Sequence, residues 1–497
     1  MVIGLYIWFT QRRLTIGGRL SMDFWRIQNV GEMRRMKYVY GSLLSLVVFA
    51  ACTSDPLENE SVNQEAANAA QNVQEEQEKY PDSVLSRVLA EELDFLKEKD
   101  GTTLFKNDQG MRIVKDNPKP VYVHYMPWFQ SLEVDGYWGQ HWTMTNRDPN
   151  IVDDNGKRQI AAHYYPTIGP YSSVDPDLQE YHFLLMKMAG IDGVIFDWYG
   201  SRNIHDYNLI KTATESFMDR LADIDLDFMI MYEDRVATMS YSESALTTEQ
   251  IIANGVSDFE YIRDMYFTKP NYGEYNGSKI LSVFGPHHIF GENHWNQLLS
   301  VFDTAGSTKF LSLWGAHDII GERAAGEFLW VDPNHIQTHE DYYEYSSIGN
   351  EIVVGGVYPG FNSYYVEGGW SEGINTWTID RNNTFEDMLS LSHHEIADFM
   401  QVITWNDFGE GTMIEPTLEF GFDNLTTLQE YTGVSFTEED MQAVVRLYNA
   451  RKDYANNDEV QNLLNRTYNY AKRLDFNRVD QLLSAVTRFY TVEKTAR

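Results

Sequence analysis

The stretch "DPDLQEYHFLLMKMAGIDGVIFDWYG" (175–200) combines a helical pattern with a strand-like run. Asp175 suits an N-cap, Pro176 suits the first helical position, and Gly190 suits a helix end. The run "GIDGVIFDWYG" (190–200) that follows is almost continuously apolar. Continuous apolar character, without alternation, is typical of a strand buried on both faces of a parallel sheet. This stretch therefore predicts one helix–strand unit of an α/β fold.

Runs of the same texture recur along the chain, with helical patterns between many of them. They are "KPVYVHYM" (119–126), "DLDFMIMYED" (225–234), "KILSVFG" (279–285), "TKFLSLWG" (308–315), "GEFLWVD" (326–332), "EIVVGGVYPG" (351–360) and the opening of "QVITWNDFGEG" (401–411). Two of the helical segments carry capping-box spacing, at Thr247/Gln250 and at Thr384/Asp387. Each of these segments therefore predicts a helix that begins at its threonine.

The alternation of strand and helix patterns predicts a (β/α)8 TIM barrel over residues 119–425. A doubly wound open sheet is the alternative fold. The segment 316–325 is the weakest point of the barrel prediction, because it is too short for a normal crossover helix. The barrel is therefore expected with an irregular connection at this place.

Helical patterns also flank the predicted barrel. The segment "SVLSRVLAEELDFLKE" (83–98) has apolar residues at helical spacing, so a helix and lead-in are expected over 83–118. Residues 426–497 predict two to three more helices, and Thr437 and Asp440 have the spacing of a capping box there.

The barrel prediction places the functional residues at one end, because barrel active sites lie at the C-terminal ends of the strands. Aromatic and ionisable residues accumulate at these ends and in the segments beside them. The expected substrate-binding residues are Tyr125, Trp128, His141, Trp142, Asp197, Trp198, Tyr232, Glu233, Trp314, Tyr358, Trp405 and Asn406. Caps, ion pairs and core packing remain open as alternatives for these residues. Aromatic rings beside carboxyl groups favour a cleft that binds a sugar.

Asp407 and Glu410 stand three residues apart directly after the last strand-like run. Cleavage of a glycosidic bond needs one carboxylic acid to protonate the leaving oxygen and a second carboxylate to activate water or to attack. Burial beside Trp405 and Phe408 would raise the pKa of an acid, which suits a proton donor. The alternative is structural: Asp407 as a cap and Glu410 as a salt-bridge partner that brace the turn.

The segment "ITWNDFGEGTMIEP" (403–416) resembles endo-acting α-mannosidases of glycoside hydrolase family 99, and it is also similar to fungal α-1,3-glucanases of family 71. Further matches are "YMPWF" (125–129), "GQHW" (139–142), "AGIDGVIFDWYG" (189–200) and "VYPGFN" (357–362). The resemblance implies a glycosidase that acts on an α-linked glycan, with Glu410 as the general acid/base and Asp407 as the second carboxylate.

One departure from the family 99 pattern bears on mechanism, because the family has a glutamate where this chain has Asp407. An aspartate is shorter by one C–C bond, roughly 1.5 Å. A carboxylate withdrawn by that much leaves space for a water, which implies inversion of configuration at the anomeric carbon. The alternative function is a barrel that binds glycan at the cell surface without cleaving it.

The single cysteine, Cys52, excludes an intramolecular disulfide and a Cys-rich metal site. Basic residues followed by the apolar run 39–51 predict a secretory signal, and Cys52 directly after it resembles a bacterial lipobox. We therefore expect an upstream extension and signal peptide over 1–52, lipidation at Cys52, and an outer-membrane lipoprotein that faces the periplasm or the cell surface. The acidic, polar segment 53–82 predicts a flexible tether.

The formal net charge of −34 argues against nucleic acid and anionic membrane surfaces as partners, and it is compatible with a neutral oligo- or polysaccharide. The chain lacks a phosphate-cradling glycine loop, so no cofactor is expected. His287 and His288 would point to different sides of an extended chain, so no metal is expected either. The expected state is a monomer whose membrane contact is the lipid anchor alone.

Overall fold

The computed structural model describes residues 111, 113–241, 245–303, 308–371, 373, 376–392 and 395–496, with side chains up to residue 487. Several predictions fall outside these ranges: the signal peptide, lipidated Cys52, the acidic tether and the helix of 83–98. Within the described part, no helix is long and apolar enough to span a membrane.

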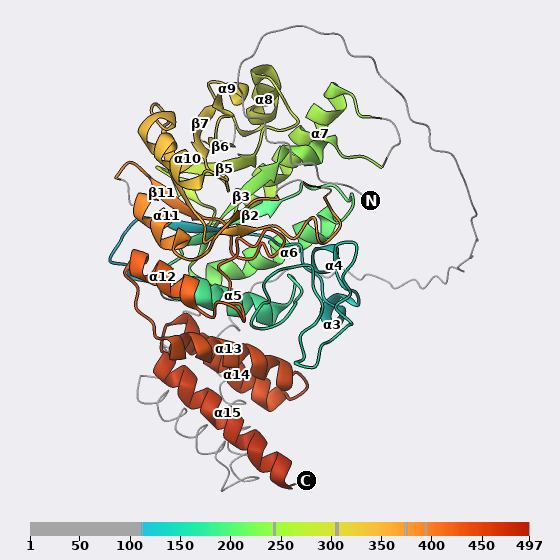
Figure 1. Ribbon diagram of the computed structural model, residues 1–497, viewed down its shortest axis with the longest axis vertical. Coiled ribbons are helices and arrows are strands. Elements are labelled where there is room, and N and C mark those ends of the chain that lie inside the picture. The colour runs from blue at the N-terminus through green and yellow to red at the C-terminus, as the bar shows by residue number, and fades with distance from the viewer. Residues whose placement is uncertain are drawn as a thin grey trace, which may run out of the picture. The chain divides into compact units, whose positions relative to one another are not determined.

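Eight parallel strands form the centre of the molecule (Figure 1). They are β1 (Val121–Tyr125), β2 (Gly193–Trp198), β3 (Asp227–Glu233), β5 (Ser278–Phe284), β6 (Thr308–Leu313), β7 (Ala324–Phe328), β8 (Ile352–Val357) and β11 (Phe399–Val402). Each strand pairs with the next in this order, and β1 pairs with β11. This closure confirms the (β/α)8 barrel and excludes the open sheet.

Short antiparallel strands are added to the barrel at two places. β4 (Glu274–Tyr275) pairs antiparallel with β5, and β9 (Phe361–Asn362) pairs antiparallel with β10 (Thr378–Ile379) in the segment after β8. The last barrel strand begins earlier than its sequence pattern indicated and ends at Val402. Asp407 and Glu410 therefore lie within the loop that follows β11.

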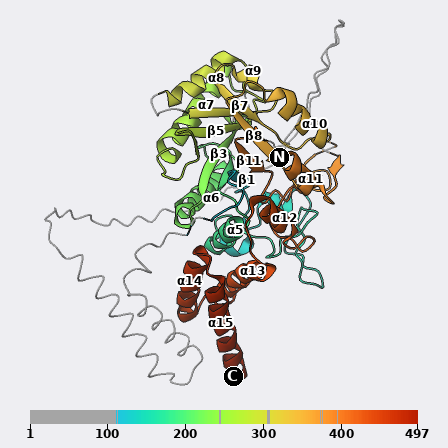
Figure 2. The same ribbon diagram turned by 90° about the vertical axis from the view of Figure 1, so that its left-hand side faces the viewer.

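Helices cover the outside of the strands, as Figure 2 shows from a second direction. They are α5 (Pro176–Met188), α6 (Tyr207–Leu221), α7 (Thr248–Tyr261), α8 (Glu292–Leu299), α9 (His317–Ile320), α10 (His335–Asp341) and α11 (Thr384–Ser392). The segment after β1 contains α3 (Leu132–Asp135) and α4 (Gln140–Thr143). Single 3-10 or π-helical turns are η1 (Ala222–Ile224), η2 (Asp234–Thr238), η3 (Ile262–Tyr266), η4 (Ser300–Phe302) and η5 (Tyr342–Ser346).

Three of the four predicted helix caps are formed, at Asp175, Thr247 and Thr437. The Asp175 side chain accepts the Asp177 amide and caps α5, and Thr247 and Gln250 form the capping box of α7. α11 begins at Thr384 as predicted, but Thr384 and Asp387 do not form a capping box: the Thr384 hydroxyl donates to the carbonyl of Asp380 and the Asp387 amide donates to the carbonyl of Asn383. The short connection between β6 and β7 contains only the four-residue helix α9.

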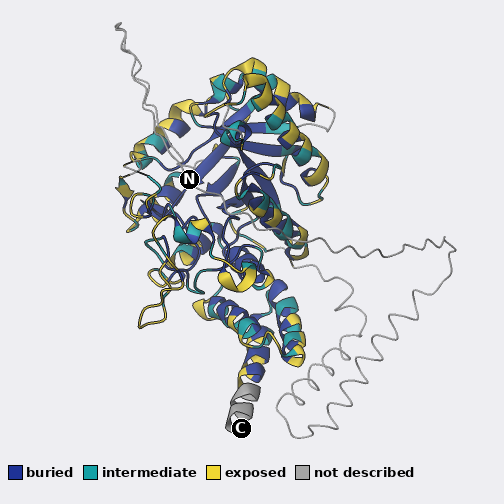
Figure 3. Cartoon of the chain, turned by 90° about the vertical axis from the view of Figure 1, so that its right-hand side faces the viewer, coloured by how far each residue is buried: buried dark blue, intermediate teal, exposed yellow. Residues whose placement is uncertain are grey.

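Four helices follow the barrel: α12 (Asp423–Thr432), α13 (Glu438–Asp453), α14 (Asp458–Lys472) and α15 (Phe476–Ala496). Thr437 and Asp440 form the predicted capping box at the start of α13. In Figure 3 the barrel strands are buried, while the covering helices turn exposed residues outward. The apolar core therefore lies inside the barrel and between its strands and helices.

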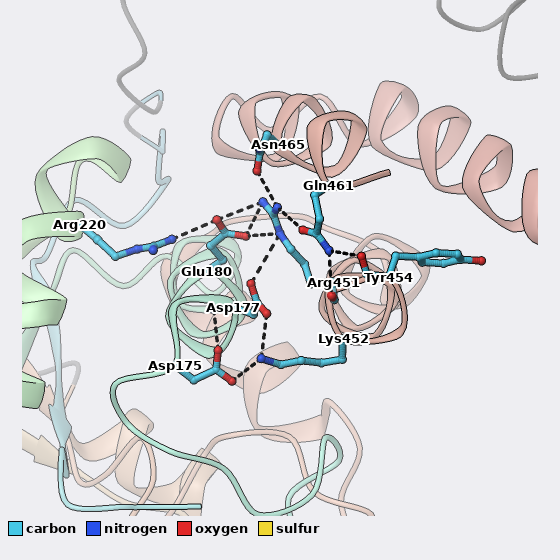
Figure 4. A network of polar contacts seen from close by, with 9 residues as sticks. All are labelled: Asp175, Asp177, Glu180, Arg220, Arg451, Lys452, Tyr454, Gln461 and Asn465. Atoms are coloured by element: carbon cyan, nitrogen blue, oxygen red, sulfur yellow. Dashed lines mark hydrogen bonds and ion pairs between the residues drawn. The ribbon is translucent and has the colours of Figure 1, made fainter. Parts of the chain in front are cut away.

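A polar network joins α13 to the barrel helix α5 (Figure 4). Arg451 contacts Glu180 with Nη2 2.9 Å from Oε2, and Lys452 lies 2.6 Å from Asp175 and 2.8 Å from Asp177. Arg451 is only 5% exposed, so this ion pair is withdrawn from water. The network ties the C-terminal helices to the helix that leads into β2.

Candidate active site

The loop after β11 is closed on itself by main-chain hydrogen bonds. The Thr404 amide donates to the Thr412 carbonyl at 3.1 Å, and the Ile414 amide donates to the Thr404 carbonyl at 2.9 Å. These bonds pair the two ends of the loop and leave residues 405–411 as its tip. The paired acids are therefore presented on a short, braced turn at the C-terminal end of the barrel.

Asp407 braces this turn through both its main chain and its side chain. Its amide donates to Oγ1 of Thr404 at 2.8 Å, and its Oδ1 accepts the amide of Glu410 at 2.9 Å. The capping role that sequence reasoning left open for Asp407 is therefore present. It does not exclude chemistry, because the same bond fixes one acid relative to the other.

Glu410 is 5% exposed, and the Tyr365 hydroxyl lies 3.5 Å from its Oε1. Its Oε2 is buried and accepts no hydrogen bond of ordinary geometry, although the Trp330 side chain acts as a donor that lowers the pKa of Glu410 against burial. Among the described side chains, no arginine or lysine forms an ion pair with Glu410 or Asp407. The salt-bridge alternative for Glu410 therefore has no partner in this part of the chain.

Burial gives the two acids different proton affinities. Burial raises the pKa of Asp407 to about 7, although hydrogen bonds from the amides of Glu410 and Gly409 oppose the rise. Burial, and after it the charge of Asp407, raises the pKa of Glu410 well above its ordinary value. Because the charge of Asp407 raises the pKa of Glu410 further, Asp407 ionises first and Glu410 keeps its proton to higher pH. A proton donor beside a group that can accept a proton is the pairing that acid–base catalysis needs.

The segment after β8 supports the tip of this loop. The Asn362 amide donates to the Glu410 carbonyl at 2.8 Å, and the Tyr364 amide donates to the Gly409 carbonyl at 2.8 Å. Gly411 has a φ of +67°, and a Cβ there would lie 2.8 Å from the Asn362 carbonyl oxygen. Glycine is therefore required beside Glu410, for conformation and for space.

Asn406 is fully buried and holds β1 and the β11 loop together. Its Oδ1 accepts the Met126 amide at 2.8 Å, and its Nδ2 donates to the Met126 carbonyl at 3.1 Å and to the Tyr171 hydroxyl at 3.2 Å. These contacts use both amide hydrogens of the side chain and one acceptor site of its oxygen. The structure therefore places Asn406 as a clamp, and not as the substrate ligand that the sequence suggested.

Asp197 and Glu233 lie on adjacent strands and face the same way. Asp197 pairs with Met231 in the parallel ladder of β2 and β3, and Glu233 is two residues beyond Met231. Side chains two residues apart point to the same face of a sheet. Glu233 forms an ion pair with Arg235 at 3.1 Å. Burial, followed by the charge of Glu233, raises the pKa of Asp197 well above its ordinary value, and Asp407 and Glu410 add to the rise.

Six predicted sugar-binding aromatic residues are in the core instead. Each of them is 0% exposed: Tyr125, Trp142, Trp198, Tyr232, Tyr358 and Trp405. Five of the rings contact helices outside the strands; for example, the Tyr232 hydroxyl donates to Asp258 of α7 at 2.9 Å. Trp142, on α4, packs on Phe129 in the long segment after β1. A fully buried ring has no free face for a sugar, so these six predictions are not supported.

The remaining predicted rings divide into two groups. Trp128 stacks on His141 with ring centroids 4.3 Å apart, and His141 meets the edge of Trp370 at 5.3 Å. Trp370 in turn stacks against Tyr365 at 6.0 Å, which links this aromatic row to Glu410. Trp314 lies elsewhere, against the core cluster formed by Leu329, Tyr342, Tyr343 and Val353.

Tyr365 and Trp370 did not emerge from the sequence, because they lie in an irregular loop without periodicity. The available signal was the aromatic cluster in "SYYVEGGW" (363–370). Neither residue follows a strand directly, so a search of strand ends passes over both.

Two other features of the described residues are separate from this site. A surface groove of about 440 Å³ between α7 and α8 is lined by outer-helix residues such as Glu249, Glu260 and His294. This groove contains neither Asp407 nor Glu410. The candidate active site is therefore placed at these two acids and not at the groove. The described residues contain no group of three or more His, Cys, Asp or Glu side chains arranged to hold a metal ion.

A closed (β/α)8 barrel with paired, buried acids at its C-terminal end is an arrangement that glycoside hydrolases use. Residues 118–435 match the family described as Glycosyl hydrolase family 99, and the chain belongs to this family.

Solved structures and curated relatives agree with this assignment. The "GH99 endo-alpha-mannosidase from Bacteroides thetaiotaomicron" superposes with a TM-score of 0.50 at 17% identity, over 64% of this chain and 98% of that one, which shows a shared fold. The "Glycoprotein endo-alpha-1,2-mannosidase-like protein" of Homo sapiens is 22% identical over 338 residues, 62% of this chain and 70% of that protein. The protein of the same name from Danio rerio is 32% identical over 88 residues, which span only 20% of its length.

Proposed function

We propose that this protein hydrolyses an α-linked glycan of the mannan or glucan type, with Glu410 as the proton donor and Asp407 as the base. The observation that carries the proposal is the state of the two acids. Both are at least 95% buried, with exposures of 3% and 5%, and neither is neutralised by an arginine or lysine of the described chain. Such a pair costs folding free energy, which a catalytic role explains.

In the proposed reaction, Glu410 gives its proton to the glycosidic oxygen as the bond to the anomeric carbon breaks. Asp407 accepts a proton from the water that attacks that carbon from the opposite face. The product then has inverted configuration. The shorter side chain of Asp407 supports this course, because inverting enzymes place a water between the substrate and the base.

The names of the relatives support α-mannan as the first substrate to test, and they support cleavage within the chain of sugars. The resemblance of the strand-eight segment to α-1,3-glucanases keeps α-glucan as the second. A glycosidase on this barrel fits the partly exposed rings of His141, Trp370 and Tyr365, because such rings stack on sugar faces; Trp128 is 6% exposed and packs on His141.

The test compares the wild type with Glu410→Gln on α-manno- and α-gluco-oligosaccharides. We expect turnover of one series by the wild type and a loss of at least about 10³-fold in the variant, because the proton donor is removed. Proton NMR of the first-formed anomer checks inversion, and a retained anomer would contradict it. Turnover that is undiminished in Glu410→Gln would contradict the assigned role of Glu410.

One observation favours a second function, the capture of glycan without cleavage. The Oδ1 atom of Asp407 is occupied by the Glu410 amide. An acid that serves only as a cap would leave a binding site without a base. Binding by calorimetry, together with no turnover in the wild type, would support this function.

For the location, we propose that Cys52 carries a lipid anchor in the outer membrane. The basic and apolar run before it supports the proposal. Fractionation of cells that express the wild type or Cys52→Ser tests it. We expect the wild type in the membrane pellet and the variant in the soluble fraction; equal distribution would contradict the anchor.

A further inference from the structure

Two carboxyl groups in the described part of the chain have a buried oxygen that no hydrogen bond or ion pair satisfies: Oδ1 of Asp197 and Oε2 of Glu410. A third buried oxygen, Oε1 of Glu415, also lacks a hydrogen bond, but it lies 3.3 Å from Nε2 of His182. Buried polar atoms are nearly always paired in folded proteins, so an exception calls for an explanation.

The other buried acids of the same barrel end show what a purely structural aspartate looks like here. Asp234 accepts the amides of His287, His288 and Ile289 at 2.7 to 3.1 Å. Asp258 accepts bonds from Ser201 and Tyr232. Both are satisfied by the protein itself. Asp197 is 3% exposed and differs from them, because nothing in the fold uses its Oδ1.

Asp197 also faces the interior of the barrel. Its neighbours Phe196 and Trp198 contact Phe217 of α6 and Tyr261 of α7, which lie outside the strands. Because side chains alternate along a strand, Asp197 points the other way. β2 is separated from β11 by β1 alone, which corresponds to two strand spacings, about 10 Å. Asp197 and the β11 loop therefore form neighbouring parts of one rim.

Asp197 and Glu233, on the adjacent strands β2 and β3, influence each other's charge. Glu233 is paired with Arg235, so its charge is balanced in place. Burial, and after it the charge of Glu233, raises the pKa of Asp197, whereas the charge of Arg235 acts in the opposite direction; the net effect disfavours the anion of Asp197. An uncharged carboxyl group can both donate and accept a hydrogen bond, as a sugar hydroxyl does.

We propose that Asp197 is a specificity-determining residue that binds one hydroxyl of the sugar held against Glu410, in the form of a neutral carboxylic acid. This proposal rests on the proposed function in one respect, that the ligand is a glycan. It assigns to Asp197 the selection of the sugar, and it leaves the proton transfers to Glu410 and Asp407.

The experiment pairs variants of Asp197 with monodeoxy analogues of the preferred oligosaccharide. In the wild type, we expect one analogue to lose about 10²-fold or more in kcat/KM, because a site built around a hydroxyl rejects a substrate that lacks it. In Asp197→Ala, we expect the parent substrate to fall by a similar factor and that same analogue to lose less than about 3-fold further. Asp197→Asn stays within about 10-fold of the wild type, because a neutral amide also donates and accepts.

The matched control is Asp258→Asn, because Asp258 lies on α7, outside the strands, and accepts hydrogen bonds from Ser201 and Tyr232. A general disturbance of the fold lowers the rate for the parent and for all analogues by the same factor, so the control shows no coupling to any one hydroxyl. Equal losses for the analogues in wild type and Asp197→Ala would overturn the proposal. Inactivity of a folded Asp197→Asn, as complete as that of Glu410→Gln, would overturn it as well, because it would require an ionised Asp197.

The same comparison of Asp197 variants with deoxy analogues is repeated as calorimetric binding in the Glu410→Gln background, so that it does not depend on turnover. Binding without turnover in the wild type would contradict the proposed hydrolysis, and the Kd values of the deoxy series would still decide the role of Asp197. Absence of both binding and turnover with α-manno- and α-gluco-oligosaccharides would overturn both proposals. Circular dichroism of each variant establishes that it is folded.

Discussion

The main-chain amide of Glu410 donates a 2.9 Å hydrogen bond to Oδ1 of Asp407, so the two acids of the site are joined by one of their own backbone groups. The bond gives Asp407 a structural and a chemical role at once. It also holds the carboxyl of Asp407 beside the segment that carries Glu410. Substitutions can separate the two roles. The side-chain oxygen of an asparagine can still accept the Glu410 amide, but it cannot act as a base.

Asp407→Asn keeps an oxygen that accepts the Glu410 amide, whereas Asp407→Ala does not. We expect both variants to lose at least about 10²-fold in kcat/KM, because neither can accept a proton. Only the alanine variant should lose the cap, which is worth about 1 kcal/mol. Denaturant unfolding and steady-state kinetics measure the two effects. An active Asp407→Asn would mean that Asp407 serves the turn alone.

The activity should follow a bell-shaped pH profile. Asp407 must be ionised to act as a base, and burial raises its pKa to about 7, so kcat/KM should rise with pH through that value. Glu410 must be protonated, so kcat/KM should fall again at higher pH, above its raised pKa. A plateau that extends down to pH 5 would contradict Asp407 as the base.

The same pKa predicts a pH-dependent cost to folding. The unfolded chain releases the Asp407 proton near pH 4, whereas the folded chain keeps it until about pH 7. The wild type should therefore lose stability as pH rises through this interval, by up to about 4 kcal/mol. Asp407→Asn cannot ionise, so it should not lose this contribution. Denaturant unfolding of both proteins at pH 4 and pH 8 makes the comparison, and parallel curves would rule out the shift.

Tyr365 is expected to tune Glu410. Its hydroxyl lies 3.5 Å from Oε1 of Glu410, and this interaction lowers the pKa of the acid against the effect of burial. In Tyr365→Phe, the alkaline limb of the pH profile should move to higher pH, with a loss of about 3- to 10-fold in kcat/KM. Tyr364→Phe is the control, because its hydroxyl binds Arg147 at 2.7 Å instead. An unchanged alkaline limb in Tyr365→Phe would show that the contact does not act on Glu410.

Arg451 should matter for stability and not for chemistry. Arg451→Met leaves Glu180 with Arg220 as its remaining partner, so the free energy of unfolding should fall by up to about 3 kcal/mol, the lower end of the cost of breaking a buried ion pair. Arg446→Met removes exposed ion pairs with Glu439 and Asp480, and it should cost less than about 1 kcal/mol. Urea titration distinguishes them. Equal effects would mean that the Figure 4 network is not stabilising.

The strands were predictable because each is a short, continuous apolar run, and closure followed from their number and order. The side-chain directions at the strand ends were predicted wrongly, because adjacent residues were all assigned to the substrate site. In β2, Asp197 and Trp198 are adjacent, so they cannot both point into the barrel. The same holds for Tyr232 and Glu233 in β3. Applied strictly, this alternation places one residue of each pair inside and the other against a helix.

The loops were beyond the reach of periodicity. Tyr365 and Trp370 reach the site through turns after β8, and no regular spacing marks them in the sequence. Asp407 and Glu410 were found because the segment around them resembles a known family motif, and not because of any hydrophobic periodicity. Their burial, and the absence of a cation beside them in the described residues, required the three-dimensional arrangement.

The family match ends at residue 435, whereas α13 begins at Glu438 and packs on α5. Trimming a recombinant version to the matched region would therefore expose the surface of α5 that α13 covers, including Tyr181, which packs against Tyr448, and would remove the Arg451 partner of Glu180. Such a shortened protein should aggregate during purification, although every residue assigned to catalysis would still be present. For this chain, the segment needed for a stable fold extends beyond the segment that matches the family.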